Sequence, residues 1–146
     1  MVSDVKDLQI PTDRQGLSPE TVEKLFIQAS IARERSYCPY SNFAVGAAIL
    51  TADGSIVLGC NVENGSYGAT VCAERTAIVT AVCQGYTEFE AFGIIADYYK
   101  PIPPCGLCRQ VVSEFSGRKV IVMFNTKGEC QITSFSTMHP FPFEFS

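Results

Sequence analysis

Three cysteines and one glutamate have the residue types and spacing of a catalytic metal site. Cys105 and Cys108 stand at i and i+3 directly after a proline, so a helix that begins there would point both thiols toward one spot. Cys72 supplies a third soft ligand, and the carboxylate of Glu74 follows two residues later. Three protein ligands leave one position of a tetrahedral zinc ion open, as hydrolysis requires, whereas structural zinc sites usually close it. The pattern predicts zinc at the cysteines and makes Glu74 the candidate catalytic carboxylate.

Positive charge near the sulfurs is the second requirement of such a site. Unpaired amides at the two predicted helix starts favour thiolates over thiols before any metal binds. Three thiolates outweigh the charge of one Zn²⁺, which makes the ion a poor Lewis acid unless something compensates. Arg75, beside Glu74, and Arg109, beside Cys108, are therefore expected to donate hydrogen bonds to the sulfurs.

The elements that must position these residues are predicted helices alternating with predicted strands. Residues 70–84 leave almost no polar face, which predicts a central buried helix, and residues 105–115 carry one apolar helical stripe. A capped helix is predicted from Ser18 onward, with apolar residues at Val22, Leu25, Phe26, Ala29 and Ala32. The predicted strands are residues 44–50 and 55–63, joined by an Asp-Gly hairpin turn, and residues 91–96 and 120–125. This alternation predicts an α/β protein with a mixed sheet and helices packed on its faces.

Length and composition predict one soluble domain. The chain has 146 residues, of which 47% are apolar and 18% charged, so it can bury a real core and is not disordered. We expect residues 1–146 to form a single domain with terminal extensions at 1–17 and 129–146. The second extension carries the only histidine, His139, expected to be solvated, and the phenylalanines Phe135, Phe141, Phe143 and Phe145.

Charge and cysteine usage exclude several classes of protein. The net charge is −4 and the basic residues are scattered, which argues against a groove that follows nucleic-acid phosphates. No apolar run has the length of a signal-peptide core or a membrane span. Seven irregularly spaced cysteines favour thiols or metal ligands over disulfides, so we expect a cytoplasmic protein in a reducing compartment. Four of them are expected to be small core or surface residues: Cys38, Cys60, Cys83 and Cys130.

Several segments together resemble the small zinc-dependent cytidine deaminases. Besides Cys-Ala-Glu-Arg-Thr-Ala at 72–77 and Pro-Cys-Gly-Leu-Cys-Arg-Gln at 104–110, they are Tyr-Cys-Pro-Tyr-Ser-Asn-Phe at 37–43, Val-Gly-Ala-Ala at 45–48, Gly-Cys-Asn-Val-Glu-Asn at 59–64 and Gly-Tyr at 85–86. The resemblance covers about residues 20 to 125, and Cys72 stands where the related signature H-x-E…P-C-x-x-C has histidine. It implies a three-layer α-β-α fold around a central mixed sheet of about five strands.

The resemblance also implies substrate contacts. Phe43 would pack against the pyrimidine, the amide of Ala73 would contact the base carbonyl, and Asn61 and Glu63 would bind the sugar 3′-hydroxyl. Two positions apart on a strand, those two side chains face the same side. The further contacts implied are Gly65, Tyr67 and Phe143. In a homotetramer, Tyr67 and Phe143 would reach into an adjacent subunit's site, although the loop at 65–70 lacks the family's Pro-Leu and the tail is more polar than the expected leucine-rich turn.

The implied activity is the hydrolytic deamination of cytidine and deoxycytidine to uridine and deoxyuridine, a reaction of pyrimidine salvage. Glu74 would take a proton from a zinc-activated water, deliver it to ring N3 and later protonate the departing amine. Three alternatives stay open: an editing deaminase acting on RNA or DNA, a structural zinc module, and a deaminase of a nucleoside antibiotic. The acidic net charge and Glu63 disfavour a nucleic-acid or mononucleotide substrate.

Overall fold

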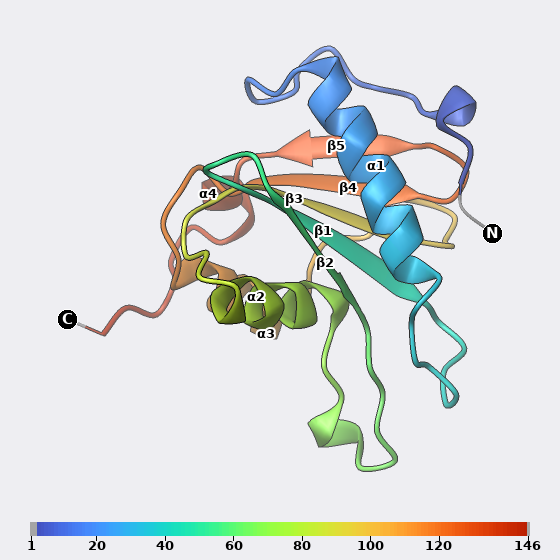
Figure 1. The fold of residues 1–146 in the computed structure, drawn as a ribbon, viewed down its shortest axis with the longest axis vertical. Coiled ribbons are helices and arrows are strands. Elements are labelled where there is room, and N and C mark those ends of the chain that lie inside the picture. The colour runs from blue at the N-terminus through green and yellow to red at the C-terminus, as the bar shows by residue number, and fades with distance from the viewer. Residues whose placement is uncertain (1–2, 146) are drawn as a thin grey trace.

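A five-stranded mixed sheet forms the centre of the computed structural model, which describes residues 3–145 (Figure 1). The strands are β1 (Val45–Thr51), β2 (Ile56–Cys60), β3 (Phe89–Ala96), β4 (Val120–Asn125) and β5 (Cys130–Thr133). They lie in the order β2-β1-β3-β4-β5; β3 and β4 pair in parallel and the other neighbours pair antiparallel. The predicted α/β class with a mixed sheet of about five strands is confirmed.

Helices cover both faces of the sheet and complete the three layers. The α-helices are α1 (Pro19–Arg33), α2 (Ala73–Cys83), α3 (Gly106–Ser113) and α4 (Phe135–Met138), and two short 3₁₀ helices are η1 (Val5–Asp7) and η2 (Tyr67–Ala69). Figure 1 shows α1 on one face and α2 and α3 on the other. Alternate strand residues enter the two cores: Ile49 packs on the α2 side and Ala48 on the α1 side. The three central strands, β1, β3 and β4, are mostly apolar because both of their faces are buried.

The capping chemistry explains where the helices begin. Ser18 caps α1 as predicted, since its hydroxyl accepts a hydrogen bond from the Thr21 amide at 3.1 Å. Helix α2 begins at Ala73, later than predicted, because Val71 still pairs with Val62 in an antiparallel bridge. Cys72 is consequently the N-cap residue of α2.

Two features differ from the sequence predictions. Helix α2 is not buried all round, because only one of its faces packs on the sheet and Val79 and Val82 are exposed to solvent in the single chain. The C-terminal extension expected from residue 129 also contains structure, since β5 pairs with the edge of β4 and α4 follows it. The pattern gave no signal for β5, which alternates weakly and is only partly buried.

Gly59 on β2 lets the backbone of α2 come close to the sheet. A Cβ atom at this position would lie 2.3 Å from the amide nitrogen of Ala77 and 2.5 Å from the carbonyl oxygen of Ala73. The hydroxyl of Thr76 donates to the carbonyl oxygen of Cys60 at 2.5 Å and ties the same two elements together. The position of the α2 N-terminus, with Cys72 and Glu74, therefore depends on the absence of a side chain at Gly59.

We expect Gly59→Ala to lower the free energy of unfolding by about 3 kcal/mol, because backbone atoms on a packed helix cannot give way as a flexible side chain can. For a chain of this size, that corresponds to a melting temperature lower by about 6–12 °C in a thermal scan. Gly68→Ala is the matched control, since a Cβ there meets no atom within 4 Å. Equal melting temperatures for the two variants would contradict the close approach.

No helix among residues 3–145 combines the length and the apolar character needed to cross a membrane.

Candidate metal centre and substrate cavity

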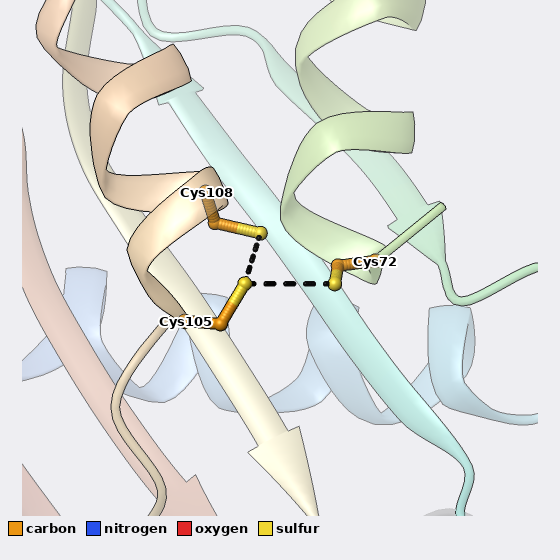
Figure 2. A group of neighbouring side chains, drawn as sticks. All are labelled: Cys72, Cys105 and Cys108. Carbon is orange, nitrogen blue, oxygen red and sulfur yellow. Dashed lines mark hydrogen bonds between the residues drawn. The ribbon is translucent and has the colours of Figure 1, made fainter. Parts of the chain in front are cut away.

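Three cysteine sulfurs converge at the N-termini of α2 and α3, as predicted (Figure 2). The Cys105 sulfur lies 3.8 Å from that of Cys72 and 3.6 Å from that of Cys108, and all three lie within 4.8 Å of one another. Zinc–sulfur bonds of about 2.3 Å in a tetrahedron place sulfurs about 3.8 Å apart. The spacing and the soft donors therefore fit one zinc ion. Among residues 3–145, this is the group of His, Cys, Asp or Glu side chains whose ligand atoms lie close enough together to hold a metal ion.

Two of the three cysteine ligands occupy N-cap positions, and their thiols are available to bind a metal because they do not cap the helices. Cys72 precedes α2 and Cys105 precedes α3, both in extended backbone conformation, and neither side chain caps its helix. The sulfurs therefore sit beside the partially positive ends of both helices, where thiolates are stabilised. Cys108 lies one turn into α3 and is fully buried.

Hydrogen bonding concentrates negative charge on Cys72. The pKa of Cys72 is lowered to about 5, first because the Cys108 thiol donates a hydrogen bond to it and then because Arg75 does. The same interaction with Cys72, together with burial, raises the pKa of Cys108. The Arg75 guanidinium reaches the Cys72 sulfur through Nη2 at 3.4 Å, and its buried Nε has no partner among the described residues.

Arg109 does not play the role expected for it. Its Nε donates to the carbonyl oxygen of Pro104 and its Nη1 to that of Met138, both at 2.8 Å. Both hydrogen bonds go to backbone carbonyls, so Arg109 fastens the start of α3 to the end of α4, and Arg75 is the arginine at the sulfurs.

We expect Arg75→Ala to weaken zinc binding by about 10–100-fold, the usual effect of removing a hydrogen-bond donor behind a metal ligand. Competition with a chromophoric chelator measures the change directly. Lys24→Ala, which removes an exposed charge from the distant helix α1, is the control. Equal zinc affinity in wild type and Arg75→Ala would show that the contact with Cys72 is incidental.

Glu74 combines burial with access to the cavity beside the sulfurs. Glu74 is only 5% exposed, yet it lines the cavity together with Cys72 and Cys105. Burial raises the pKa of Glu74, and the negative charge on Cys72 raises it further. A carboxyl group whose pKa moves toward neutrality can both accept and return a proton at working pH.

The cavity has a volume of about 290 Å³, close to the lower size of small-molecule sites. Four residues assigned to substrate from the sequence line it: Phe43, Asn61, Glu63 and Ala73. Five others that the sequence analysis did not single out complete the lining: Ser41, Val45, Thr70, Ile102 and Pro103. Ala73 is the first residue of α2, where amides have no partner within the helix.

The side chain of Asn61 makes hydrogen bonds to the residues that lead into β1. Its Nδ2 donates to the carbonyl oxygen of Phe43 at 2.8 Å, and its Oδ1 accepts from the Val45 amide at 2.9 Å and the Ser36 hydroxyl at 2.5 Å. The side chain is buried, with 8% exposure, so these bonds stabilise the turn that carries Phe43.

Glu63 is held by the loop before β1. Its Oε1 accepts from the amides of Tyr40 at 3.0 Å and Ser41 at 3.1 Å, and its Oε2 accepts from the Ser41 hydroxyl. The hydroxyl of Ser41 lowers the pKa of Glu63 first of all, followed by the backbone amides. Glu63 is therefore an oriented carboxylate at the cavity wall.

The remaining predicted contacts lie away from this cavity within the single chain. Tyr67, which is 76% exposed, lines a neighbouring cavity, where its ring meets that of Tyr40 edge to face. Gly65 is exposed in the same loop. Phe143 is 72% exposed and is held by its backbone, because the Gln110 side chain accepts from its amide and donates to its carbonyl oxygen.

The family profile described as "Cytidine and deoxycytidylate deaminase zinc-binding region" matches residues 19–124. A cytidine deaminase of Sporosarcina psychrophila is 47% identical over 120 residues, covering 82% of this chain and 88% of that protein. One from Halalkalibacterium halodurans is 43% identical over 129 residues, covering 88% and 92%. The crystal structure of cytidine deaminase from Burkholderia pseudomallei superposes with a TM-score of 0.80 at 42% identity, covering 87% of this chain and all of that one.

Proposed function

This chain belongs to the cytidine and deoxycytidylate deaminase family, and from that premise we propose that it hydrolyses cytidine and deoxycytidine to uridine and deoxyuridine with release of ammonia. The observation that carries the proposal is the shared cavity. Two of the three cysteine ligands, Cys72 and Cys105, border one space of nucleoside size together with the buried carboxyl group of Glu74 and the ring of Phe43, and the third ligand, Cys108, lies beside them.

Cys72, Cys105 and Cys108 would hold the zinc, which when bound with one open position lowers the pKa of a water molecule. Glu74 accepts a proton from the attacking water and delivers it to N3 of the pyrimidine as C4 is attacked. Glu74 then takes the proton of the new hydroxyl group on C4 and passes it to the exocyclic nitrogen, which leaves as ammonia, and the base retains the water oxygen as its 4-carbonyl. Burial suits Glu74 to this shuttle because its raised pKa lets it hold and release the proton.

The other walls of the cavity fit a nucleoside. Phe43 offers a face for the pyrimidine, and the Ala73 amide offers a donor for the base carbonyl. Asn61 and Glu63 line the same cavity and would face the sugar, with Glu63 presenting an oriented acceptor. The carboxylate also repels a phosphate there, which together with the net charge of −4 favours a nucleoside over a nucleotide or a nucleic acid.

Turnover of purified protein separates this proposal from its rivals. Cytidine and deoxycytidine are incubated with the zinc-loaded protein, and the loss of cytosine absorbance and the release of ammonia are followed. A cytosine-containing oligonucleotide and a cytosine nucleoside antibiotic are offered as competitors. Zinc-loaded protein that deaminates neither nucleoside refutes the proposal, and preferred turnover of either competitor reassigns the substrate.

We also infer a homotetramer that works in cytoplasmic pyrimidine salvage. Its support is the apolar surface of the single chain: Val79, Val82, Leu107, Phe141, Phe143 and Phe145 are all exposed. In such an assembly Gly65, Tyr67 and Phe143 would contribute to substrate contacts within or between subunits. All seven cysteines are free, in keeping with a reducing compartment. Light scattering should give four times the chain mass of 15.9 kDa; a monomer would contradict the shared site.

A further inference from the structure

Tyr98, which lies outside the cavity lining, contacts the ring of Phe43. The two ring centroids lie 6.2 Å apart at an interplanar angle of 88°, an edge-to-face contact. We propose that Tyr98 is a positioning residue that fixes the orientation of the Phe43 ring and thereby sets the affinity for the pyrimidine. This inference rests on the proposed function for its kinetic consequence, but the contact itself does not.

The backbone of Phe43 is fixed by two hydrogen bonds that do not involve its ring. Its amide donates to the Ser41 hydroxyl at 3.0 Å, and its carbonyl oxygen accepts from the Asn61 side chain at 2.8 Å. Neither hydrogen bond restrains the side-chain torsions. Among the described residues, Tyr98 is the aromatic side chain that contacts the Phe43 ring, so it is the candidate for orienting this wall of the cavity.

Tyr98 can act as a support because its own backbone is anchored to the core. Asn125, at the end of β4, is fully buried, and its Nδ2 donates to the carbonyl oxygen of Tyr98 at 3.2 Å. The hydroxyl of Thr126 donates to the Asp97 carboxylate at 2.9 Å, which secures the residue before it. The Tyr99 ring packs against Tyr98 with centroids 4.5 Å apart. The loop after β3 is therefore tied to the β4–β5 turn.

Loss of the Tyr98 ring should weaken substrate binding and leave proton transfer by Glu74 unchanged. A planar base stacks well only on a ring that is already oriented parallel to it. If the Phe43 ring can rotate, binding of the base must also fix its orientation, which lowers the affinity. Glu74 belongs to α2 and is therefore positioned by a different element from this loop. The same loop leads to Cys105, however, so zinc content must be measured beside the kinetics.

Kinetics on cytidine compare Tyr98→Ala and Tyr98→Phe with wild type. We expect Tyr98→Ala to raise KM by about threefold to tenfold, the range that an edge-to-face pair supports, with kcat within about twofold and zinc content unchanged. Tyr98→Phe keeps the ring and should restore wild-type KM. In a Phe43→Leu background, Tyr98→Ala should have little further effect on KM, because the group it positions is gone.

A second measurement tests the contact without turnover. In zinc-loaded protein labelled with ¹³C-phenylalanine, the order parameter of the Phe43 ring should fall in Tyr98→Ala and recover in Tyr98→Phe, with the resonance assigned by Phe43→Leu. An unchanged order parameter, a KM effect that persists undiminished without Phe43, or loss of zinc in Tyr98→Ala would each overturn the inference. Wild-type protein inactive on cytidine would defeat the proposed function, and the ring measurement would then decide the role of Tyr98 by itself.

Discussion

Replacement of Glu74 by glutamine is expected to lower kcat on cytidine by about 10²–10⁴-fold while the protein keeps its zinc, the range typical of a lost general acid–base. Glutamine has nearly the same shape, so the packing at the start of α2 is retained. It has no oxygen that can accept a proton from water and return it to the base. The other carboxylate that lines the cavity, Glu63, already accepts hydrogen bonds from Tyr40 and Ser41 and is therefore not free to replace Glu74.

Stability measurements distinguish a catalytic Glu74 from a structural one. Burial raises the pKa of this carboxyl group, which means that its charged form is disfavoured by the fold. The neutral glutamine is therefore expected to leave the melting temperature unchanged or raise it, a common trade between stability and activity. Glu23→Gln, on the exposed face of α1, is the control and should change neither quantity. If Glu74→Gln retained more than about a tenth of the wild-type kcat, the proton shuttle would lie elsewhere.

The metal site could be predicted from the sequence because its geometry is local. Cys105 and Cys108 are separated by one helical turn, and Cys72 stands at the beginning of another helix, so helix starts alone define where the thiols point. That Cys72 would meet the other two thiols was predicted from Cys72-Ala73-Glu74 and its match to the signature H-x-E…P-C-x-x-C. Arg75 was predicted because it stands beside Glu74, and its position one turn after Cys72 brings its guanidinium to the sulfur.

The cavity walls could be predicted only in part because they depend on contacts between distant loops. Ile102 and Pro103 reach the cavity from an irregular segment with no periodicity, and Ser41 does so through its bonds to Glu63. The pairing of Tyr98 with Phe43 joins residues far apart in the chain. The error on Arg109 has a similar origin, since the carbonyl of Met138 that it binds belongs to α4, which carried no sequence signal.

Replacement of Cys105 by serine should remove zinc and activity together. The hydroxyl is a poor ligand for zinc beside thiolates, and two remaining cysteines leave the ion with too few protein ligands. We expect the zinc content, measured by mass spectrometry of the metal, to fall from one per chain to less than about a tenth, and turnover to fall by at least about a hundredfold. Because Cys105 is exposed, serine itself should disturb the packing little.

Cys83→Ser separates the loss of a ligand from the loss of any thiol. Cys83 is exposed at the end of α2 and lies outside the sulfur group, so its variant should keep full zinc and full activity. A lower melting temperature is expected for Cys105→Ser, since bound zinc stabilises only the folded chain, and chelation of wild type should lower it equally. Chelated wild type that still deaminates cytidine would place the reaction outside this metal centre, because Glu74 alone gives water no means of attack at neutral pH.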